Sequence, residues 1–218
     1  MSASDSFLDQ PTPLLRWGPA VLKLEMWRTS RAFDYGGPGV IEASGNAAIA
    51  AAAWARRRGV EITVVPRGVF THEMLETLKL WGVRVDRHAR PTLPHPDAKE
   101  IFARTLGAEL RAGISAPPPL VVAPAGDRDA LLGALSEWPS VRGVALVAAD
   151  EELPDLPFGD GVPVTRAQAA AARARVAREL GLLTGHAAAA AAVYAHEHGG
   201  VALVTSPGER EFSLDRSP

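Results

Sequence analysis

The residues whose types and spacing best suit chemistry are Ser44, Gly45, Asn46 and Ala47. They follow a short apolar run, residues 40–43, and precede an alanine-rich stretch. This order predicts a strand that leads through a turn into a helix. A helix N-terminus presents free backbone N–H groups and a positive dipole end to an anion, and a Ser hydroxyl adds one more donor. The four residues are therefore a candidate site for a carboxylate or an amino acid, although a simple helix cap is the interpretation that we favour.

A second polar group consists of Gly126, Asp127, Arg128 and Asp129, and it follows another apolar run, residues 120–123. Acidic side chains are common in the first turn of a helix because they complement the positive end of the helix dipole. From residue types alone we interpret this group as the solvated start of a helix.

The triplet His196, Glu197 and His198 has the residue types of a metal site but not the spacing. Two histidines that are two residues apart on a helix point to different sides, so they do not chelate one ion as an i, i+4 pair does. No metal site is predicted.

Composition narrows the function classes further. The chain has 218 residues, 47% of them hydrophobic and 22% charged, with a net charge of −2 and no Cys. This balance lacks the basic face of a nucleic-acid-binding protein, and disulfides and thiolate catalysis are excluded. We see no membrane span and no signal peptide, so we expect neither a nucleic acid nor a membrane as partner and take the cytoplasm as the default location.

Short apolar runs alternate with helical stretches, which predicts an α/β protein with parallel strands. Strands are expected at residues 21–24, 40–43, 61–65, 83–85, 120–123, 141–147 and 201–205. Helices are expected at residues 46–58, from the cap Thr71 to about 81, from 97 to about 112, at 127–135, at 165–180, and after Gly185. Residues 150–161 are expected to form an exposed loop. We expect a small lobe at residues 36–89 and a large lobe from residues 1–35 and 90–218.

Several motifs, in the same order along the chain, resemble those of the fold-type II enzymes that depend on pyridoxal phosphate (PLP), the tryptophan synthase β-like group that includes cysteine synthase and threonine synthase. They are Pro11-Thr12-Pro13-Leu14, Val21-Leu22-Lys23-Leu24-Glu25, the strand and Ser-Gly-Asn turn at 40–48, the unit at 59–85, the segment 162–185 and the end of the last strand at 201–210. The resemblance implies two lobes of parallel sheet with helices on both faces, and a dimer.

The departures from this family fall where its cofactor is bound. Ala32 stands where the family carries the lysine that forms the Schiff base with PLP, and the chain has only three lysines, Lys23, Lys79 and Lys99. Gly126, Asp127 and Arg128 occupy the position of the glycine-rich phosphate loop, where a carboxylate opposes a phosphate dianion. Asn46 is retained and matches the family's asparagine at the ring hydroxyl.

These departures predict a truncated and degenerate homologue, a pseudoenzyme with no catalytic residues and no cofactor. It is expected to act as a binding or assembly protein, as a homodimer or as the partner of an active paralogue. The alternative is a PLP-dependent lyase or transferase that acts on amino acids and holds its cofactor in an altered way, with Lys23, Lys79 or Lys99 as its lysine. A third hypothesis is a sensor of amino acids or carboxylates, built on residues 44–47.

Overall fold

The structure, a computed structural model, describes residues 11–27, 36–43, 45–68, 70–94, 97–150 and 159–205. The chain divides into two units. Unit 1 comprises Met1–Gln10 and Arg28–Asp97, and unit 2 comprises Pro11–Trp27 and Ala98–Pro218. Residues 36–89, for which a small lobe is expected, fall within the range of unit 1.

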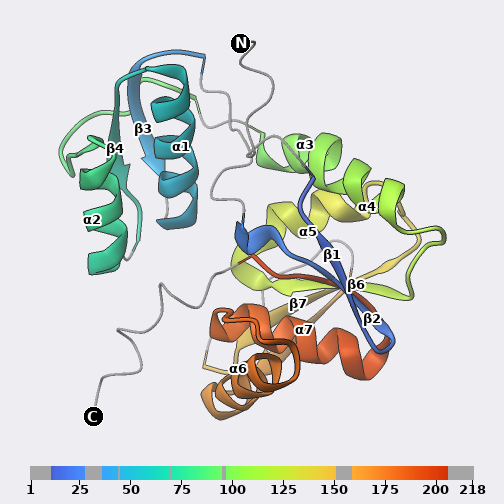
Figure 1. The fold of residues 1–218 in the computed structure, drawn as a ribbon. Coiled ribbons are helices and arrows are strands. Elements are labelled where there is room, and N and C mark those ends of the chain that lie inside the picture. The colour runs from blue at the N-terminus through green and yellow to red at the C-terminus, as the bar shows by residue number, and fades with distance from the viewer. Residues whose placement is uncertain are drawn as a thin grey trace. The chain divides into compact units, whose positions relative to one another are not determined.

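Unit 1 is a three-stranded parallel sheet with two helices, which lie in the chain between successive strands (Figure 1). Its elements are β3 (Gly39–Ala43), α1 (Gly45–Arg58), β4 (Ile62–Pro66), α2 (His72–Leu80) and β5 (Arg84–Val85). The sheet order β3-β4-β5 follows the chain. Parallel neighbours need a crossover connection, which here is a helix each time.

The helix starts and ends of unit 1 follow from local chemistry. Thr71 caps α2, because its hydroxyl accepts a hydrogen bond from the backbone N–H of Met74 at 3.3 Å. Gly59 and Gly82, which follow the two helices, have φ angles of 65° and 70°. These angles lie in the left-handed region that favours glycine, so both helices end where the sequence predicts.

Unit 2 contains a six-stranded sheet in the order β1-β2-β9-β6-β7-β8, in which only β1 runs antiparallel to its neighbour. The strands are β1 (Leu14–Trp17), β2 (Ala20–Lys23), β6 (Leu120–Pro124), β7 (Arg142–Ala148), β8 (Gly159–Val164) and β9 (Gly200–Leu203). The helices are the 3-10 turns η2 (Glu25–Trp27) and η4 (Ala125–Asp127), the π segment η3 (Ala103–Gly107), and α3 (Ala98–Phe102), α4 (Ala108–Gly113), α5 (Arg128–Leu135), α6 (Arg166–Leu180) and α7 (His186–His198).

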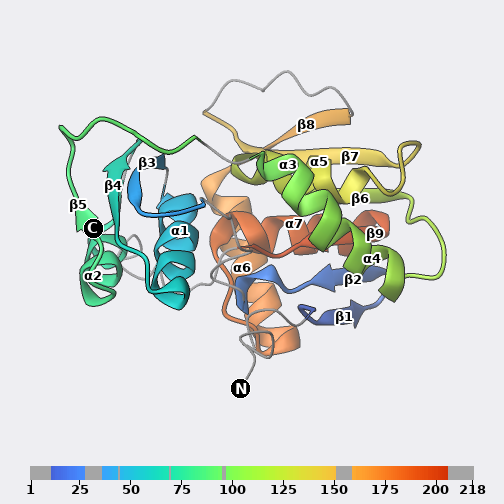
Figure 2. The same ribbon diagram turned by 90° about the horizontal axis from the view of Figure 1, so that it is seen from above.

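Helices cover both faces of this sheet (Figures 1 and 2). The alternation along β6 shows the two cores: Val121 and Ala123 pack in a cluster with residues of η3, α4 and α5, whereas Leu120 and Val122 pack in a cluster with residues of α6 and α7. Successive side chains of a strand point to opposite faces, so a strand covered on both faces is apolar throughout, as β6 is.

The predicted α/β class with parallel sheets is confirmed, and three details are corrected. The strand β1 was not expected. Residues 159–161 were expected in an exposed loop but lie in β8, while residues 151–158 fall outside the described part of the chain. The helix expected from 97 to 112 contains the π segment η3 between α3 and α4.

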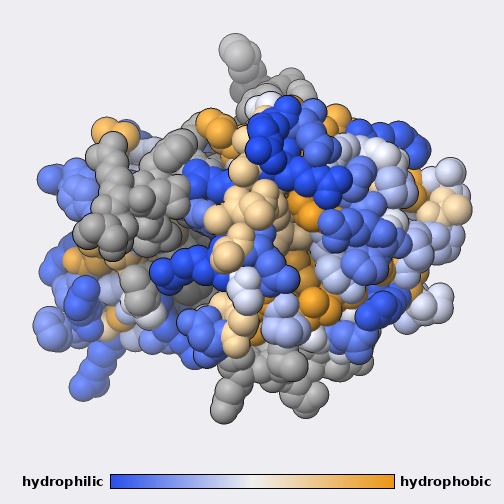
Figure 3. Space-filling view, turned by 90° about the horizontal axis from the view of Figure 1, so that it is seen from below, coloured by the Kyte–Doolittle hydropathy of each residue, from blue (hydrophilic) through white to orange (hydrophobic). Residues whose placement is uncertain are grey.

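The surface mixes polar and apolar residues. On the face that Figure 3 shows, hydrophilic and hydrophobic residues are interspersed. The large hydrophobic side chains that are exposed within the described ranges are Leu80 in unit 1 and Leu183 in unit 2. No helix among the described residues is long and apolar enough to span a membrane.

Candidate ligand site and the buried lysine

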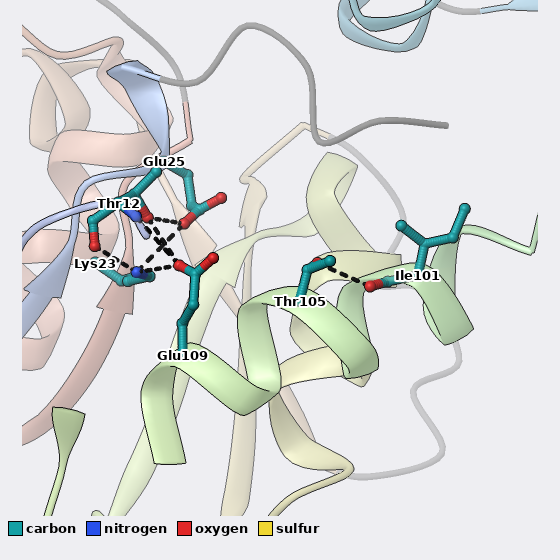
Figure 4. Close-up of polar contacts among 6 residues, drawn as sticks. All are labelled: Thr12, Lys23, Glu25, Ile101, Thr105 and Glu109. Carbon is teal, nitrogen blue, oxygen red and sulfur yellow. Dashed lines mark hydrogen bonds and ion pairs between the residues drawn. The ribbon is translucent and has the colours of Figure 1, made fainter. Parts of the chain in front are cut away.

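Lys23, at the end of β2, is buried and hydrogen-bonded inside unit 2 (Figure 4). Its ammonium donates to the backbone carbonyl of Thr12 at 2.5 Å and to Oε2 of Glu109 at 2.6 Å, and its side chain is only 1% exposed. The Glu25 carboxylate lies 3.9 Å from the same ammonium. A buried charge is tolerated when it is paired and hydrogen-bonded, so these contacts explain how the sheet accommodates a lysine.

Thr12 joins both carboxylates of this cluster. Its backbone N–H donates to Glu109 Oε2 at 3.2 Å, and its hydroxyl donates to Oε1 of Glu25. The antiparallel pairing of β1 with β2 brings Thr12, which precedes β1, beside the residues that follow Lys23. The cluster thereby links the segment before β1 to the end of β2.

Glu109 reaches Lys23 from the helical segment that covers this face of the sheet. It lies in α4, directly after the π segment η3. In η3 the Thr105 hydroxyl donates to the backbone carbonyl of Ile101 at 2.8 Å (Figure 4). A π segment makes one turn wider and so changes the phase of the helix that follows it. The position of Glu109 therefore depends on the π segment, which the sequence pattern does not predict.

The other two lysines lie on helix surfaces. Lys79, in α2, is 79% exposed and lies 3.8 Å from Glu76, and Lys99, in α3, is also exposed. A lysine that forms a Schiff base needs a neutral amine held at the reacting carbonyl. Lys23 has an ion-paired amine within a core, and Lys79 and Lys99 have solvated ones.

The second polar group lies at the carboxyl ends of β6 and β9, which are parallel neighbours. Thr205, just after β9, donates its hydroxyl hydrogen to Oδ2 of Asp127 at 2.5 Å. Burial raises the pKa of the Asp127 carboxyl above its ordinary value, and the hydrogen bond from Thr205 opposes that rise. Asp127 is thus a half-buried, hydrogen-bonded residue, which corrects its interpretation as part of a solvated helix start.

The neighbours of Asp127 face solvent. Arg128 and Asp129, in the first turn of α5, are exposed as expected, and Gly126 has no atom within 4 Å of the place where a Cβ would stand. Asp127 holds the N-cap position of α5, yet its side chain makes no capping hydrogen bond. Its carboxylate is therefore engaged with the end of β9 instead of the helix.

The first candidate group belongs to unit 1. Gly45 begins α1 and Ala47 is half-buried in its first turn, while Ser44 lies outside the described residues. Asn46 is placed in α1 by its backbone, and its side chain is not described. Ala32 also lies outside the described residues. The residues at 44–47 and those at 126–128 thus belong to different units of the chain.

Neither histidine at the end of α7 forms part of a metal cluster. Within the described residues no group of three or more potential His, Asp or Glu ligands is close enough to hold a metal ion. The His196 ring stacks on Trp17 with 4.2 Å between ring centroids, and His198 stacks on Tyr194 at 4.1 Å. Both rings contribute to packing.

No protein-family model and no curated protein sequence matches the chain. Solved structures do match. O-ureido-L-serine synthase has a TM-score of 0.75 at 19% identity, over 98% of this chain and 96% of its own. An O-ureido-L-serine-bound lysine-to-alanine mutant of that synthase has a TM-score of 0.73 at 21% identity, over 98% of this chain and 94% of its own. The O-acetylserine-dependent cystathionine β-synthase of Helicobacter pylori has a TM-score of 0.74 at 16% identity, over 94% of this chain and 95% of its own.

The chain has the fold of the fold-type II PLP-dependent enzymes. The fold predicted from the ordered motifs is thereby confirmed. At 16% to 21% identity the likeness shows the fold alone. The expected loss of activity is not shown, and the PLP-dependent lyase or transferase stays an alternative.

The described residues do not fit PLP as the fold-type II enzymes hold it. Lys23 is held in ion pairs within a core, and Lys79 and Lys99 are solvated. At the position that the motif resemblance assigns to the phosphate loop, Asp127 places a hydrogen-bonded carboxylate. Like charges in one site oppose each other's binding. PLP therefore enters no step of the function proposed below.

Sequence reasoning missed three residues that shape these sites. Thr12 belongs to the Pro11–Leu14 motif, which served only to indicate the family. Thr205 was expected only as the end of the last strand. Glu109 carried no signal, because its contact with Lys23 spans 86 positions and follows a π segment. The structural role that the resemblance implies for Lys23 agrees with its burial.

Proposed function

We propose that the protein is a non-catalytic, cytoplasmic binding protein built on the fold of the PLP-dependent enzymes, and that its ligand is a free amino acid or another small carboxylate. The observation that carries the proposal is the state of Lys23, whose ammonium is buried between Glu109, Glu25 and the Thr12 carbonyl. A chain whose lysines are either ion-paired in a core or solvated has no group suited to hold PLP as a Schiff base.

The start of α1 is the proposed place for the ligand carboxylate. The helix has no acidic residue in its first turn and three arginines, Arg56, Arg57 and Arg58, in its last. Its N-terminal N–H groups and dipole therefore attract an anion without a competing negative side chain. Ser44 and Asn46 are the proposed side-chain donors.

A solved neighbour supports an amino acid as the ligand class. The lysine-to-alanine mutant of O-ureido-L-serine synthase is described as O-ureido-L-serine-bound. An alanine in place of a lysine is thus compatible with amino-acid binding on this fold. Ala32 stands at the position where the family motif has its lysine.

Thermal unfolding in the presence of a panel of amino acids tests the proposal. A ligand that binds only the native state, at one hundred times its dissociation constant, adds about 2.7 kcal/mol of stability. We expect at least one amino acid to raise the melting temperature, and the matching amine without a carboxylate, such as ethanolamine for serine, to leave it unchanged.

A charge variant tests the location of the ligand site. Ala47→Asp places a negative charge in the first turn of α1, which favours the helix but repels a carboxylate. Ala167→Asp is the matched control, because it places the same charge in the first turn of α6. Loss of the ligand-induced shift in the first variant alone supports the site, whereas equal shifts in both variants contradict it.

The second candidate function is that of a PLP-dependent lyase or transferase that acts on amino acids. The solved neighbours named as synthases favour it. It requires a Schiff base on Lys23, Lys79 or Lys99, and an absorption band that borohydride fixes to one of these lysines would establish it.

Assembly is part of the proposal. We propose that the chain forms a homodimer, or a complex with an active paralogue that would place it beside a catalytic partner. Light scattering on the purified chain, alone and mixed with such a paralogue, measures both.

A further inference from the structure

We propose that the carboxyl ends of β6 and β9 in unit 2 exclude phosphorylated ligands, because the Asp127 carboxylate occupies this position as an internal anion. The inference rests on the proposed function in taking the ligand to be independent of PLP, and it adds that the ligand carries no phosphate group near this strand end.

The backbone here does not form a glycine-rich loop. Such a loop binds phosphate by leaving several backbone N–H groups free to point at it. In this chain the residues after β6 form the 3-10 turn η4, Ala125–Asp127, which continues directly into α5. The proposed exclusion of phosphate therefore rests on the side chains at this strand end.

The side chains oppose a phosphate as well. Asp127 lies at the strand end itself, where it accepts a hydrogen bond from Thr205 across neighbouring strands. Asp129 adds a second acidic group in the first turn of α5, and Arg128 is the one cation of the triplet. The triplet Asp127-Arg128-Asp129 thus has a net charge of −1.

The hydrogen bond to Thr205 fixes the carboxylate at the end of β9. An acidic residue at an N-cap commonly accepts from the first backbone N–H groups of its helix. Asp127 makes no such bond. The carboxylate is instead hydrogen-bonded to Thr205, so it stands at the strand end beside the start of α5, where it competes with an incoming anion.

Pyridoxine 5′-phosphate is the probe for this inference. It has the ring and the phosphate of PLP but no aldehyde, so its binding does not involve a lysine. Equilibrium dialysis, followed by the absorbance of the ring, measures the binding. We expect no binding to the wild-type chain at concentrations up to about 1 mM, the range of a weak ligand.

The charge-removing variant Asp127→Asn keeps an acceptor for Thr205 and takes away the anion. We expect it to bind pyridoxine 5′-phosphate at least about tenfold more tightly than the wild type, with no gain for unphosphorylated pyridoxine. The matched control Asp129→Asn removes an exposed charge, which solvent screens, so we expect a smaller gain. Asp127→Ser is the second variant if Asp127→Asn unfolds, as judged by its thermal unfolding curve.

Two results overturn the inference. Binding of pyridoxine 5′-phosphate by the wild type contradicts the exclusion, and no gain in either Asp127 variant contradicts the role of Asp127. The proposed function fails in a different experiment, since a reducible Schiff base with PLP concerns a lysine and leaves the result with pyridoxine 5′-phosphate unchanged.

Discussion

Lys23 and Glu109 lie 86 positions apart in the chain and join through a hydrogen bond of 2.6 Å within unit 2. Lys23 is 1% exposed and Glu109 is 14% exposed, so this is a buried ion pair. Each charge is costly to bury alone, and the pair is retained because each compensates the other. Because the Lys23 amine is held as an ion-paired ammonium, the one buried lysine among the described residues is not available as a nucleophile.

Glu109→Gln is predicted to destabilise the protein by about 3–5 kcal/mol, because it leaves the Lys23 ammonium buried without its closest carboxylate. The matched control is Glu137→Gln, also in unit 2, where the carboxylate lies 3.8 Å from the exposed Arg111. An ion pair of that kind contributes less than about 1 kcal/mol. Urea unfolding measures both, and equal losses in the two variants contradict the account.

Asp127→Asn is predicted to stabilise the protein at neutral pH. Burial raises the pKa of Asp127 in the folded state, so the folded state holds this proton more tightly than the unfolded state does. The cost of its charge is full above the folded pKa and disappears as the pH falls to the ordinary value of 3.8. Unfolding measured from pH 7 to 3 should therefore show a gap between variant and wild type that closes on acidification. A gap that widens on acidification is the contrary result.

Gly133→Ala is predicted to destabilise unit 2 even though alanine is the better helix former. A Cβ at Gly133 would lie 2.4 Å from Cβ of Phe102 and 2.7 Å from its backbone carbon, where α3 crosses α5. Such overpacking costs about 1–3 kcal/mol. Gly126→Ala is the control, because a Cβ there meets no atom within 4 Å. Melting temperatures of the two variants test this prediction. A Gly133→Ala protein as stable as the control would contradict it, because Phe102 would then move aside without cost.

Glu179 is predicted to make stability depend on pH in the acid range. The hydrogen bond from Arg175, at 2.9 Å, lowers its pKa, and the Trp17 indole also donates to it, at 3.1 Å. A carboxyl with a lowered folded pKa contributes stability above its ordinary value of 4.5, which is lost as the pH falls through the folded pKa. Glu179→Gln should flatten the pH dependence of unfolding below pH 4.5. An unchanged profile speaks against this contribution.

Much of the fold could be predicted because local chemistry and tertiary structure agree. Thr165 and Gln168 form a capping box at the start of α6, and Gly181 ends that helix with a φ angle of 67°. The strand β8 escaped prediction because its sequence, with two glycines and a proline, is typical of a loop. Among the described residues it is an edge strand that pairs only with β7, and an edge tolerates Pro163, which has no N–H to donate.

The candidate sites were only partly predictable. Gly126, Asp127 and Arg128 were found from their order after an apolar strand, but the partner of Asp127, Thr205, lies 78 positions away and depends on the parallel pairing of β6 with β9. Residue spacing reports neighbours within one helix or strand. It does not report contacts that the sheet order creates, which is why the burial of Asp127 was missed.

The most direct test of the central claim is the absorption spectrum of the chain purified with added PLP, before and after borohydride, followed by peptide mapping. We expect no retained Schiff-base band and no lysine that borohydride modifies, because Lys23 is ion-paired in a core and Lys79 and Lys99 are solvated. A band that borohydride fixes to a peptide containing one of these lysines would contradict the account and establish a PLP-dependent enzyme.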